Sequence, residues 1–120
     1  MDVYFRQSKL SKICNSDKLM RKAYGRRMAD KLGQRLWELR AANCLGDISR
    51  LRPCRCHKLT GKQTGQFSVD LENPYRLLFV PAYEDDEDIF SEDGGFDLSK
   101  IKEIEILKID DTHDPKFKRR

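Results

Sequence analysis

A histidine, an aspartate and an arginine in the second half of the chain have the types and spacing for acid–base chemistry on an anionic substrate. His113 is the best candidate for a general acid or base, because imidazole titrates near neutrality. Asp111 stands two residues before it, so on a strand both side chains would share a face and the carboxylate could orient the imidazole. Arg76 is a lone cation in an apolar run, where an unpaired charge is costly. We therefore expect a phosphate beside it, or structurally the carboxylate of Asp70 or Asp111.

The loop before these strands adds groups that could hold a phosphate and a base. Gly61 and Gly65 bracket Lys62, so the backbone can approach a ligand closely and the ammonium can pair with a phosphate. The hydroxyl of Thr60 can hydrogen-bond to such a ligand. A stacked aromatic ring is worth roughly 1–3 kcal/mol per base, which makes Tyr75 a candidate. The remaining candidates for nucleic-acid contacts are Arg55, His57, Lys58 and Gln66.

Two strands joined by a tight turn should position Arg76. Residues 66–71 alternate polar and apolar side chains, which is the period of a half-buried strand. Residues 72–74 favour a turn, since Pro74 fixes φ and lacks an N–H. Residues 75–80 are almost continuously apolar, as expected of a central strand. A last strand should begin at Ser99-Lys100 and reach residue 109, with Ile104, Ile106 and Lys108 on one face and Ile101, Leu107 and Ile109 on the other.

The first half of the chain predicts helices. Residues 3–5 form a short strand at a sheet edge, and residues 9–23 form a helix that could break near residues 15–17, where Ser16 or Asp17 can cap a fresh turn. A second helix spans residues 26–43, with an apolar face of Met28, Leu32, Leu36 and Leu39 and with Arg26, Arg27, Lys31, Arg35 and Arg40 mostly elsewhere. Residues 45–51 link it to a strand at residues 54–59.

Size and charge favour one domain with a polyanionic partner. The 120 residues fit a single domain, residues 1–120, and neither a membrane-length apolar run nor a signal region is present, which predicts a cytoplasmic protein. Residues 1–82 hold 17 Lys and Arg against 7 Asp and Glu, whereas residues 83–120 hold 7 against 13. A basic body suggests nucleic acid as partner, and the alternative is a solvated, charge-rich helical surface. Residues 84–97 read as an acidic, solvated loop and residues 114–120 as a basic tail.

The four cysteines predict reduced thiols rather than a metal site. Cys54 and Cys56 beside His57, with Cys44 far away, lack the paired C-x₂-C spacing of structural zinc sites. On a strand, His57 would also point away from the two thiols. We therefore expect no metal and no cofactor.

The stretch KLTGKQTGQFSVDLENPYRLLFVP resembles the core signature of the RelE/ParE toxin superfamily, and most closely its HigB-like (killer protein) branch. Gly61, Gly65, Gln66, Phe67 and Ser68 match the family's loop, and the following strand matches at Pro74, Tyr75, Arg76, Leu77 and Phe79. Residues 24–42, YGRRMADKLGQRLWELRAA, are also typical of this branch. The ending matches at Ile109, Asp111 and His113, whereas Thr112 replaces the expected aromatic residue. Thr60 stands where some relatives carry histidine, so His57 would have to substitute for it.

The resemblance implies an α+β, RelE-like fold, with an N-terminal helical hairpin packed on a small, mostly antiparallel, twisted sheet. It implies the toxin of a type II toxin–antitoxin pair: a metal-independent, ribosome-dependent endoribonuclease that cuts mRNA by 2′-OH attack. The implied partners are a helix-turn-helix, HigA-like antitoxin, with which it could bind operator DNA as a hetero-oligomer, and mRNA on the ribosome. The alternatives are a non-catalytic binding or co-repressor module, and a ParE-like gyrase inhibitor.

Overall fold

The computed structural model describes residues 1–49, 56–59, 65–82 and 95–111, which form helices packed on one sheet. The strands are β1 (Asp2–Phe5), β2 (His57–Lys58), β3 (Phe67–Asp70), β4 (Tyr75–Pro81) and β5 (Glu103–Asp111). Their order in the sheet is β1-β5-β4-β3-β2, in which β1 runs parallel to β5 and every other pair is antiparallel. The α+β class and the edge position of the first strand are thereby confirmed.

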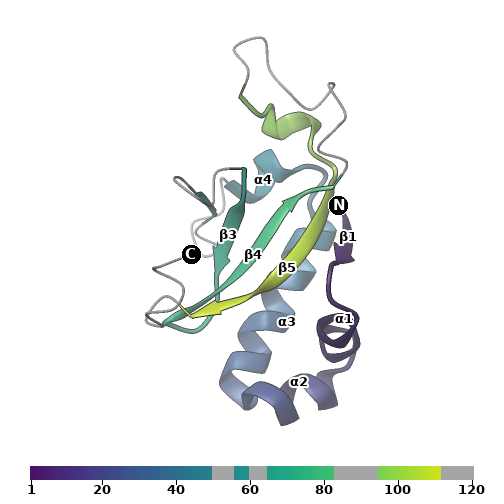
Figure 1. Ribbon diagram of the computed structural model, residues 1–120, viewed down its shortest axis with the longest axis vertical. Coiled ribbons are helices and arrows are strands. Elements are labelled where there is room, and N and C mark those ends of the chain that lie inside the picture. The colour runs from purple at the N-terminus through teal and green to yellow at the C-terminus, as the bar shows by residue number, and fades with distance from the viewer. Residues whose placement is uncertain (50–55, 60–64, 83–94, 112–120) are drawn as a thin grey trace.

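The helices lie together on one face of this sheet (Figure 1). They are α1 (Ser8–Cys14), α2 (Asp17–Tyr24), α3 (Arg26–Ala41) and α4 (Leu45–Ser49). The expected break after the first helical turns is confirmed, because the Ser16 hydroxyl accepts a hydrogen bond from the Leu19 amide at 3.2 Å and caps α2. Gly25, with φ +81°, separates α2 from α3.

The main core fills the space between the helices and the sheet. Leu32, Leu36 and Leu39 on α3 pack toward Leu77 and Phe79 of β4, as the apolar face of the helix predicts. The Phe79 ring stacks on Phe67 of β3, with 5.9 Å between ring centroids. A smaller apolar cluster occupies the opposite face of the sheet and consists of Leu59, Leu78, Val80 and Leu107.

A β-bulge in β5 overturns the expected faces of the last strand. Leu78 pairs with Lys108 but the next residue, Phe79, pairs with Ile106, so Leu107 is an extra residue on β5. The bulge reverses the alternation. As a result, Ile109 packs in the main core with Ile104 and Ile106, and Ile101 joins them from before the strand. Leu107 lies in the small cluster on the other face.

The structure corrects the expectations at residues 98–100 and at Arg35, and other expectations lie partly or wholly outside the described residues. Residues 98–100 form a short 3-10 helix, Leu98–Lys100, because Asp97 accepts hydrogen bonds from the amide and hydroxyl of Ser99 at 3.1 and 2.6 Å. The link at residues 45–51 begins with helix α4, and the expected strand at residues 54–59 is described only as β2, at 57–58. Arg35 is buried, with 3% exposure, rather than on the polar face of α3. Residues 84–94 of the acidic loop and the tail at 114–120 lie outside the described residues; at the end of that loop, Phe96 packs on Phe67.

Gly33 in the middle of α3 offers a test of this packing. Of the described residues, only Met20 would lie within 4 Å of a Cβ added there, with its Cε atom at 3.9 Å, which is ordinary contact. Because glycine loses more backbone freedom than alanine in a helix, Gly33→Ala should raise the free energy of unfolding by about 0.5–1 kcal/mol. Urea denaturation of the purified variant measures it.

Gly25 supplies the matched control for that substitution. Its backbone, at φ 81° and ψ 165°, lies in a region almost restricted to glycine. Gly25→Ala should therefore lower the free energy of unfolding by about 1–3 kcal/mol. If Gly33→Ala lost stability as Gly25→Ala does, the contact between α2 and α3 at Gly33 would be too tight for a methyl group, which would contradict the prediction.

Candidate functional site

The candidate site lies on the sheet face that no described helix covers. Side chains alternate along a strand, so Ser68 of β3 and Arg76 of β4 point away from the helices, as Leu78 does. After the bulge, Lys108 and Asp110 of β5 pair with Leu78 and Arg76 and join the same face. We call the residues Ser68, Arg76, Lys108 and Asp110 the β-face cluster.

Arg76 makes an ion pair with Asp110 across strands β4 and β5. Its Nε and Nη2 atoms both donate to the same oxygen, Asp110 Oδ2, at 3.3 Å. The side chain of Arg76 is 25% exposed and that of Asp110 is 1% exposed. The Asp110 carboxylate thus offsets the free-energy cost of burying the Arg76 cation. The partner of Arg76 is Asp110 rather than the expected Asp70 or Asp111.

The hydrogen bonding of this pair is incomplete. Among the described residues, Asp110 Oδ1 and the Ser68 hydroxyl are buried polar atoms without a hydrogen-bond partner. Such atoms are uncommon in folded proteins, because an unmade buried hydrogen bond is costly. A guanidinium carries five N–H donors and a fork that matches two oxygens, yet here it shares one oxygen. The geometry leaves donor capacity at Arg76 for a second anion.

Asp111 and Tyr75 lie on the opposite side of the sheet from Arg76. Tyr75 pairs with Asp111, and both residues directly neighbour members of the β-face cluster along their strands, so they point toward the helices. Tyr75 is 40% exposed. The described part of the expected catalytic set is therefore divided between two faces.

The remaining predicted site residues fall into two groups. Gln66 is half-buried, and its carbonyl accepts a hydrogen bond from the Leu59 amide at 2.9 Å, next to the small apolar cluster. Lys58 pairs with Phe67 and is exposed, and the backbone of His57 pairs with Ser68. Arg55, Thr60, Lys62 and His113 lie outside the described residues.

Sequence reasoning missed three members of the β-face cluster as site residues. Asp110 and Lys108 lie on this face only because of the bulge at Leu107. The sequence around Leu107 does not predict this bulge. Ser68 is fully buried, at 0% exposure, in a position where alternation predicts a polar, solvated side chain. The sequence could have indicated Ser68 as a site residue, because it stands between the apolar residues Phe67 and Val69 on the strand that precedes Arg76.

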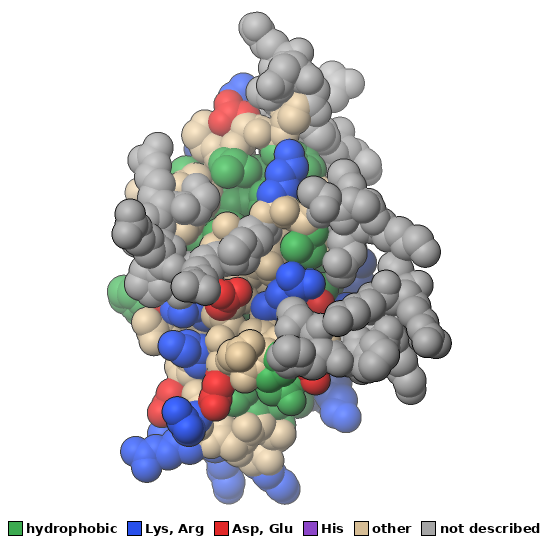
Figure 2. Space-filling model, turned by 90° about the vertical axis from the view of Figure 1, so that its left-hand side faces the viewer, with side chains coloured by type: hydrophobic (Ala, Val, Ile, Leu, Met, Phe, Trp, Pro, Cys, Tyr) green, Lys and Arg blue, Asp and Glu red, His purple; other side chains and the backbone are tan. Residues whose placement is uncertain are grey.

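Exposed cations gather at the end of the molecule formed by α2 and the start of α3 (Figure 2). The ion pairs there are weak, with Arg21 to Asp17 at 3.2 Å and Arg27 to Glu72 at 3.9 Å, both on exposed side chains. This surface accounts for part of the basic character of the chain and suits a polyanionic or acidic partner. Its exposed cations are Lys18, Arg21, Lys22, Arg26 and Arg27.

The described cysteines form no disulfide, and two of them, Cys14 and Cys56, have surroundings that make the thiol unreactive. Burial raises the pKa of the Cys56 thiol to about 11, and it raises that of Cys14 to about 11 against an opposing effect of Arg40. Such thiols stay protonated near neutral pH and are poor nucleophiles and metal ligands. Among the described residues, no group of three or more His, Cys, Asp or Glu side chains could hold a metal ion.

No helix in the described ranges is long and apolar enough to cross a membrane. A scan of the chain against protein-family models and a search of curated proteins each found no match.

Proposed function

We propose that this chain is the toxin of a type II toxin–antitoxin pair, a ribosome-dependent endoribonuclease with a RelE-like fold of the HigB-like branch. Two features support the proposal: the resemblance of residues 58–81, and an α+β architecture in which a helical hairpin covers one face of a mostly antiparallel sheet. The other face carries the β-face cluster. Such a toxin would act in the cytoplasm, where ribosomes translate.

The observation that carries the proposal is the state of Arg76. Arg76 is a cation within an otherwise apolar strand, and one quarter of its side chain is exposed. Two of its N–H groups donate to the same carboxylate oxygen. Arginine–carboxylate pairs frequently bond both carboxylate oxygens fork-to-fork, whereas Arg76 bonds only Oδ2 of Asp110. The remaining guanidinium donors can bind a phosphate that reaches this face.

The reaction would need a cation at the phosphate and groups that move protons. The 2′-oxygen of one nucleotide attacks the adjacent phosphorus, the P–O5′ bond breaks, and a 2′,3′-cyclic phosphate and a 5′-hydroxyl result. Arg76 and Lys108 stabilise the extra negative charge of the pentacovalent phosphate, and Asp110 holds the guanidinium in place. His113 would transfer a proton to or from the reacting oxygens. DNA lacks the attacking hydroxyl and would not be cut.

The proposed partners follow from the same assignment. A HigA-like, helix-turn-helix antitoxin would neutralise the enzyme, and the complex would bind operator DNA through the antitoxin. The exposed cations of α2 and α3 would favour acidic segments of that antitoxin or the phosphates of ribosomal RNA.

A second candidate is a non-catalytic module with the same fold that occupies the ribosome or acts as a co-repressor. The division of Asp111 and Arg76 between opposite faces favours it, because a histidine oriented by Asp111 would lie far from a phosphate at Arg76. Thr112 and Thr60, where the resemblance expects an aromatic and in some relatives a histidine, point the same way. A gyrase inhibitor is the third candidate.

Induced expression separates these candidates. Wild type should arrest growth and create new mRNA 5′ ends, and Arg76→Lys should lower cleavage at least about tenfold, because lysine keeps the charge and loses the fork. Arg21→Lys, an exposed arginine on α2, is the matched control and should cleave as wild type. His113→Ala, compared at equal protein level, tests the proton-transfer role.

The outcomes are distinct. Arrest without mRNA cleavage would favour the non-catalytic module, and arrest with DNA breakage by purified gyrase would favour the gyrase inhibitor. Expression of folded protein with neither arrest nor cleavage would contradict the proposed function.

A further inference from the structure

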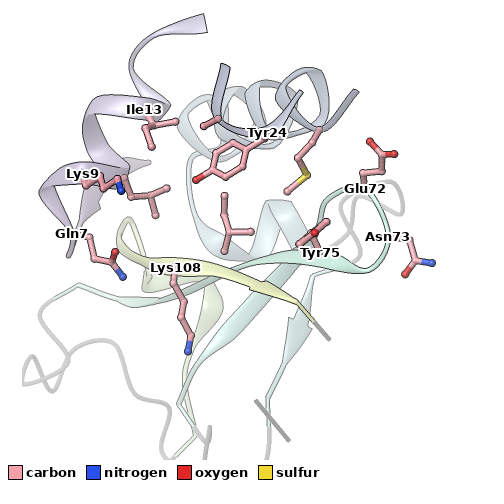
Figure 3. A pocket seen from close by; sticks show the side chains of 12 residues that line it. Gln7, Lys9, Ile13, Tyr24, Glu72, Asn73, Tyr75 and Lys108 are labelled. Atoms are coloured by element: carbon pink, nitrogen blue, oxygen red, sulfur yellow. The ribbon is translucent and has the colours of Figure 1, made fainter. Parts of the chain in front are cut away.

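A cavity of about 650 Å³ lies on the helix side of the sheet, away from the β-face cluster. Its walls come from the start of α1, the end of α2, the turn between β3 and β4, and β5 (Figure 3). The volume falls within the range of about 300–1,000 Å³ that is typical of small-molecule sites. Its apolar lining comes from Leu10, Ile13, Met28 and Ile109.

Two tyrosines enter this cavity from different layers. Tyr24 reaches down from α2 and Tyr75 lies on β4, so their rings approach the space from the helices and from the sheet (Figure 3). Tyr75 is 40% exposed and Tyr24 is half-buried. Aromatic walls beside an aliphatic lining favour a planar ring, and stacking of a base on such a wall is insensitive to base identity.

One end of the cavity offers polar groups for an anion and for a hydrogen-bonding ring edge. The Glu72 carboxylate lies at the other end, away from Lys9 (Figure 3), and pairs with Arg27 at 3.9 Å. Lys9 at the start of α1 is exposed and borders the cavity, and no ion pair of it occurs among the described residues. Gln7 is held by a hydrogen bond from its Nε2 to the Leu107 carbonyl at 3.1 Å, which fixes its amide at the wall. Asn73 of the β3–β4 turn also borders the cavity, but its side chain is exposed and points away from it in Figure 3.

Tyr24 also provides a hydrogen-bond donor. Burial, and to a lesser degree the neighbouring Cys14, raises the pKa of its phenol above the ordinary value. The hydroxyl therefore stays protonated across the neutral range. Lys108 borders the cavity too, but its side chain points away from it in Figure 3, so Lys9 is the cation available to a ligand.

We propose that this cavity binds a nucleoside monophosphate unit, with the base between Tyr24 and Tyr75 and the phosphate at Lys9. The amide of Gln7 hydrogen-bonds the base edge, since an amide offers both a donor and an acceptor. Tyr75 and Arg76 are neighbours on β4 that point to opposite faces, so the site is separate from the β-face cluster. It does not depend on the proposed function. The unit could be a free nucleotide or one residue of a single-stranded RNA.

Calorimetric titration of the purified full chain tests the proposal, with 5′-AMP, adenosine and a six-nucleotide oligoadenylate as probes. We expect saturable binding of 5′-AMP or of the oligonucleotide, weakened about tenfold or more by Tyr75→Leu and by Lys9→Gln. Lys12→Gln is the matched control, because Lys12 is exposed on α1 but does not line the cavity. Binding of 5′-AMP identifies a free nucleotide as sufficient, and binding of the oligonucleotide alone identifies a strand.

Three results would overturn the proposal: no saturable binding of any probe, binding that neither cavity variant weakens, or adenosine binding as tightly as 5′-AMP. Arg21→Gln, at an exposed arginine that belongs neither to the cavity lining nor to the β-face cluster, should leave the binding of 5′-AMP unchanged. Loss of 5′-AMP binding in that variant would place the site on the exposed cations of α2 and overturn the proposal. This readout is independent of mRNA cleavage, so the nucleotide site and the proposed function can fail separately.

Discussion

Replacement of Arg76 by leucine should lower the free energy of unfolding by about 3 kcal/mol, because it leaves the Asp110 carboxylate buried without its cation. Asp110 is 1% exposed and one of its oxygens already lacks a hydrogen-bond partner among the described residues. The carboxylate would have to take up a proton or draw in water. Urea denaturation of wild type and variant gives the difference directly.

A double substitution turns this prediction into a test of what the pair does. Buried ion pairs are often no more stabilising than apolar side chains of similar size, so Arg76→Leu combined with Asp110→Leu should recover most of the lost stability. If Arg76 binds phosphate, the recovered protein should still fail to cleave mRNA. A double variant that is both stable and active would mean that the pair only holds β4 to β5. A loss below about 0.5 kcal/mol in the single variant would mean that the pair is effectively solvated.

Arg35 should be as sensitive as Arg76, although it lies on α3. Its side chain is 3% exposed, donates from Nε to the Asp70 carbonyl at 2.7 Å and pairs through Nη1 with Glu38 at 2.8 Å. It therefore ties α3 to the end of β3. Arg35→Met should lower the free energy of unfolding by about 3 kcal/mol, because it removes a buried hydrogen bond to the Asp70 carbonyl and the ion pair with Glu38.

The control for Arg35 lies on the same helix. Arg40 is exposed, and its hydrogen bond to the Asn15 side chain is long, at 3.4 Å. Arg40→Met should change the free energy of unfolding by less than about 0.5 kcal/mol. Equal losses in the two variants would contradict a specific role for Arg35 in joining the helix to the sheet.

The fold was largely predictable because its periodic signals are long. The apolar face of α3 and the strands around the turn at residues 72–74 follow directly from spacing. The burial of Arg35 was not predictable, because it depends on a hydrogen bond to the Asp70 carbonyl at the end of β3. The sequence around residue 35 does not indicate that this carbonyl lies beside α3. The 3-10 helix at residues 98–100 depends on a local cap by Asp97, a short-range competition that an apolar pattern does not reveal.

The candidate site was less predictable than the fold, for one physical reason. A single extra residue on β5 changes which side chains face Arg76, and a period-two reading cannot detect it. Spacing alone therefore selected Asp111, where the register of the sheet selects Asp110. The charge of the sequence indicates that cationic residues would contact a polyanion. Which of them lie on the same face of the sheet follows only from the strand pairing.

The division of β4 gives the molecule two chemically different faces. Tyr75 contributes to a cavity under the helices and Arg76 to the β-face cluster, one residue apart in the chain. Strand alternation alone keeps these side chains on opposite sides of the sheet. Substitutions at one should leave the binding chemistry of the other intact, which is why the two proposals can be tested separately.

The most direct test of the central claim is cleavage of a short mRNA bound to purified ribosomes, followed by analysis of the product ends. The proposed function predicts cuts only in ribosome-bound mRNA, products with a 2′,3′-cyclic phosphate and a 5′-hydroxyl, and resistance when the attacking 2′-OH is methylated. The folded double variant of Arg76 and Asp110 should not cut. Intact mRNA with the wild-type protein, or cleavage that persists in the methylated substrate, would contradict the account.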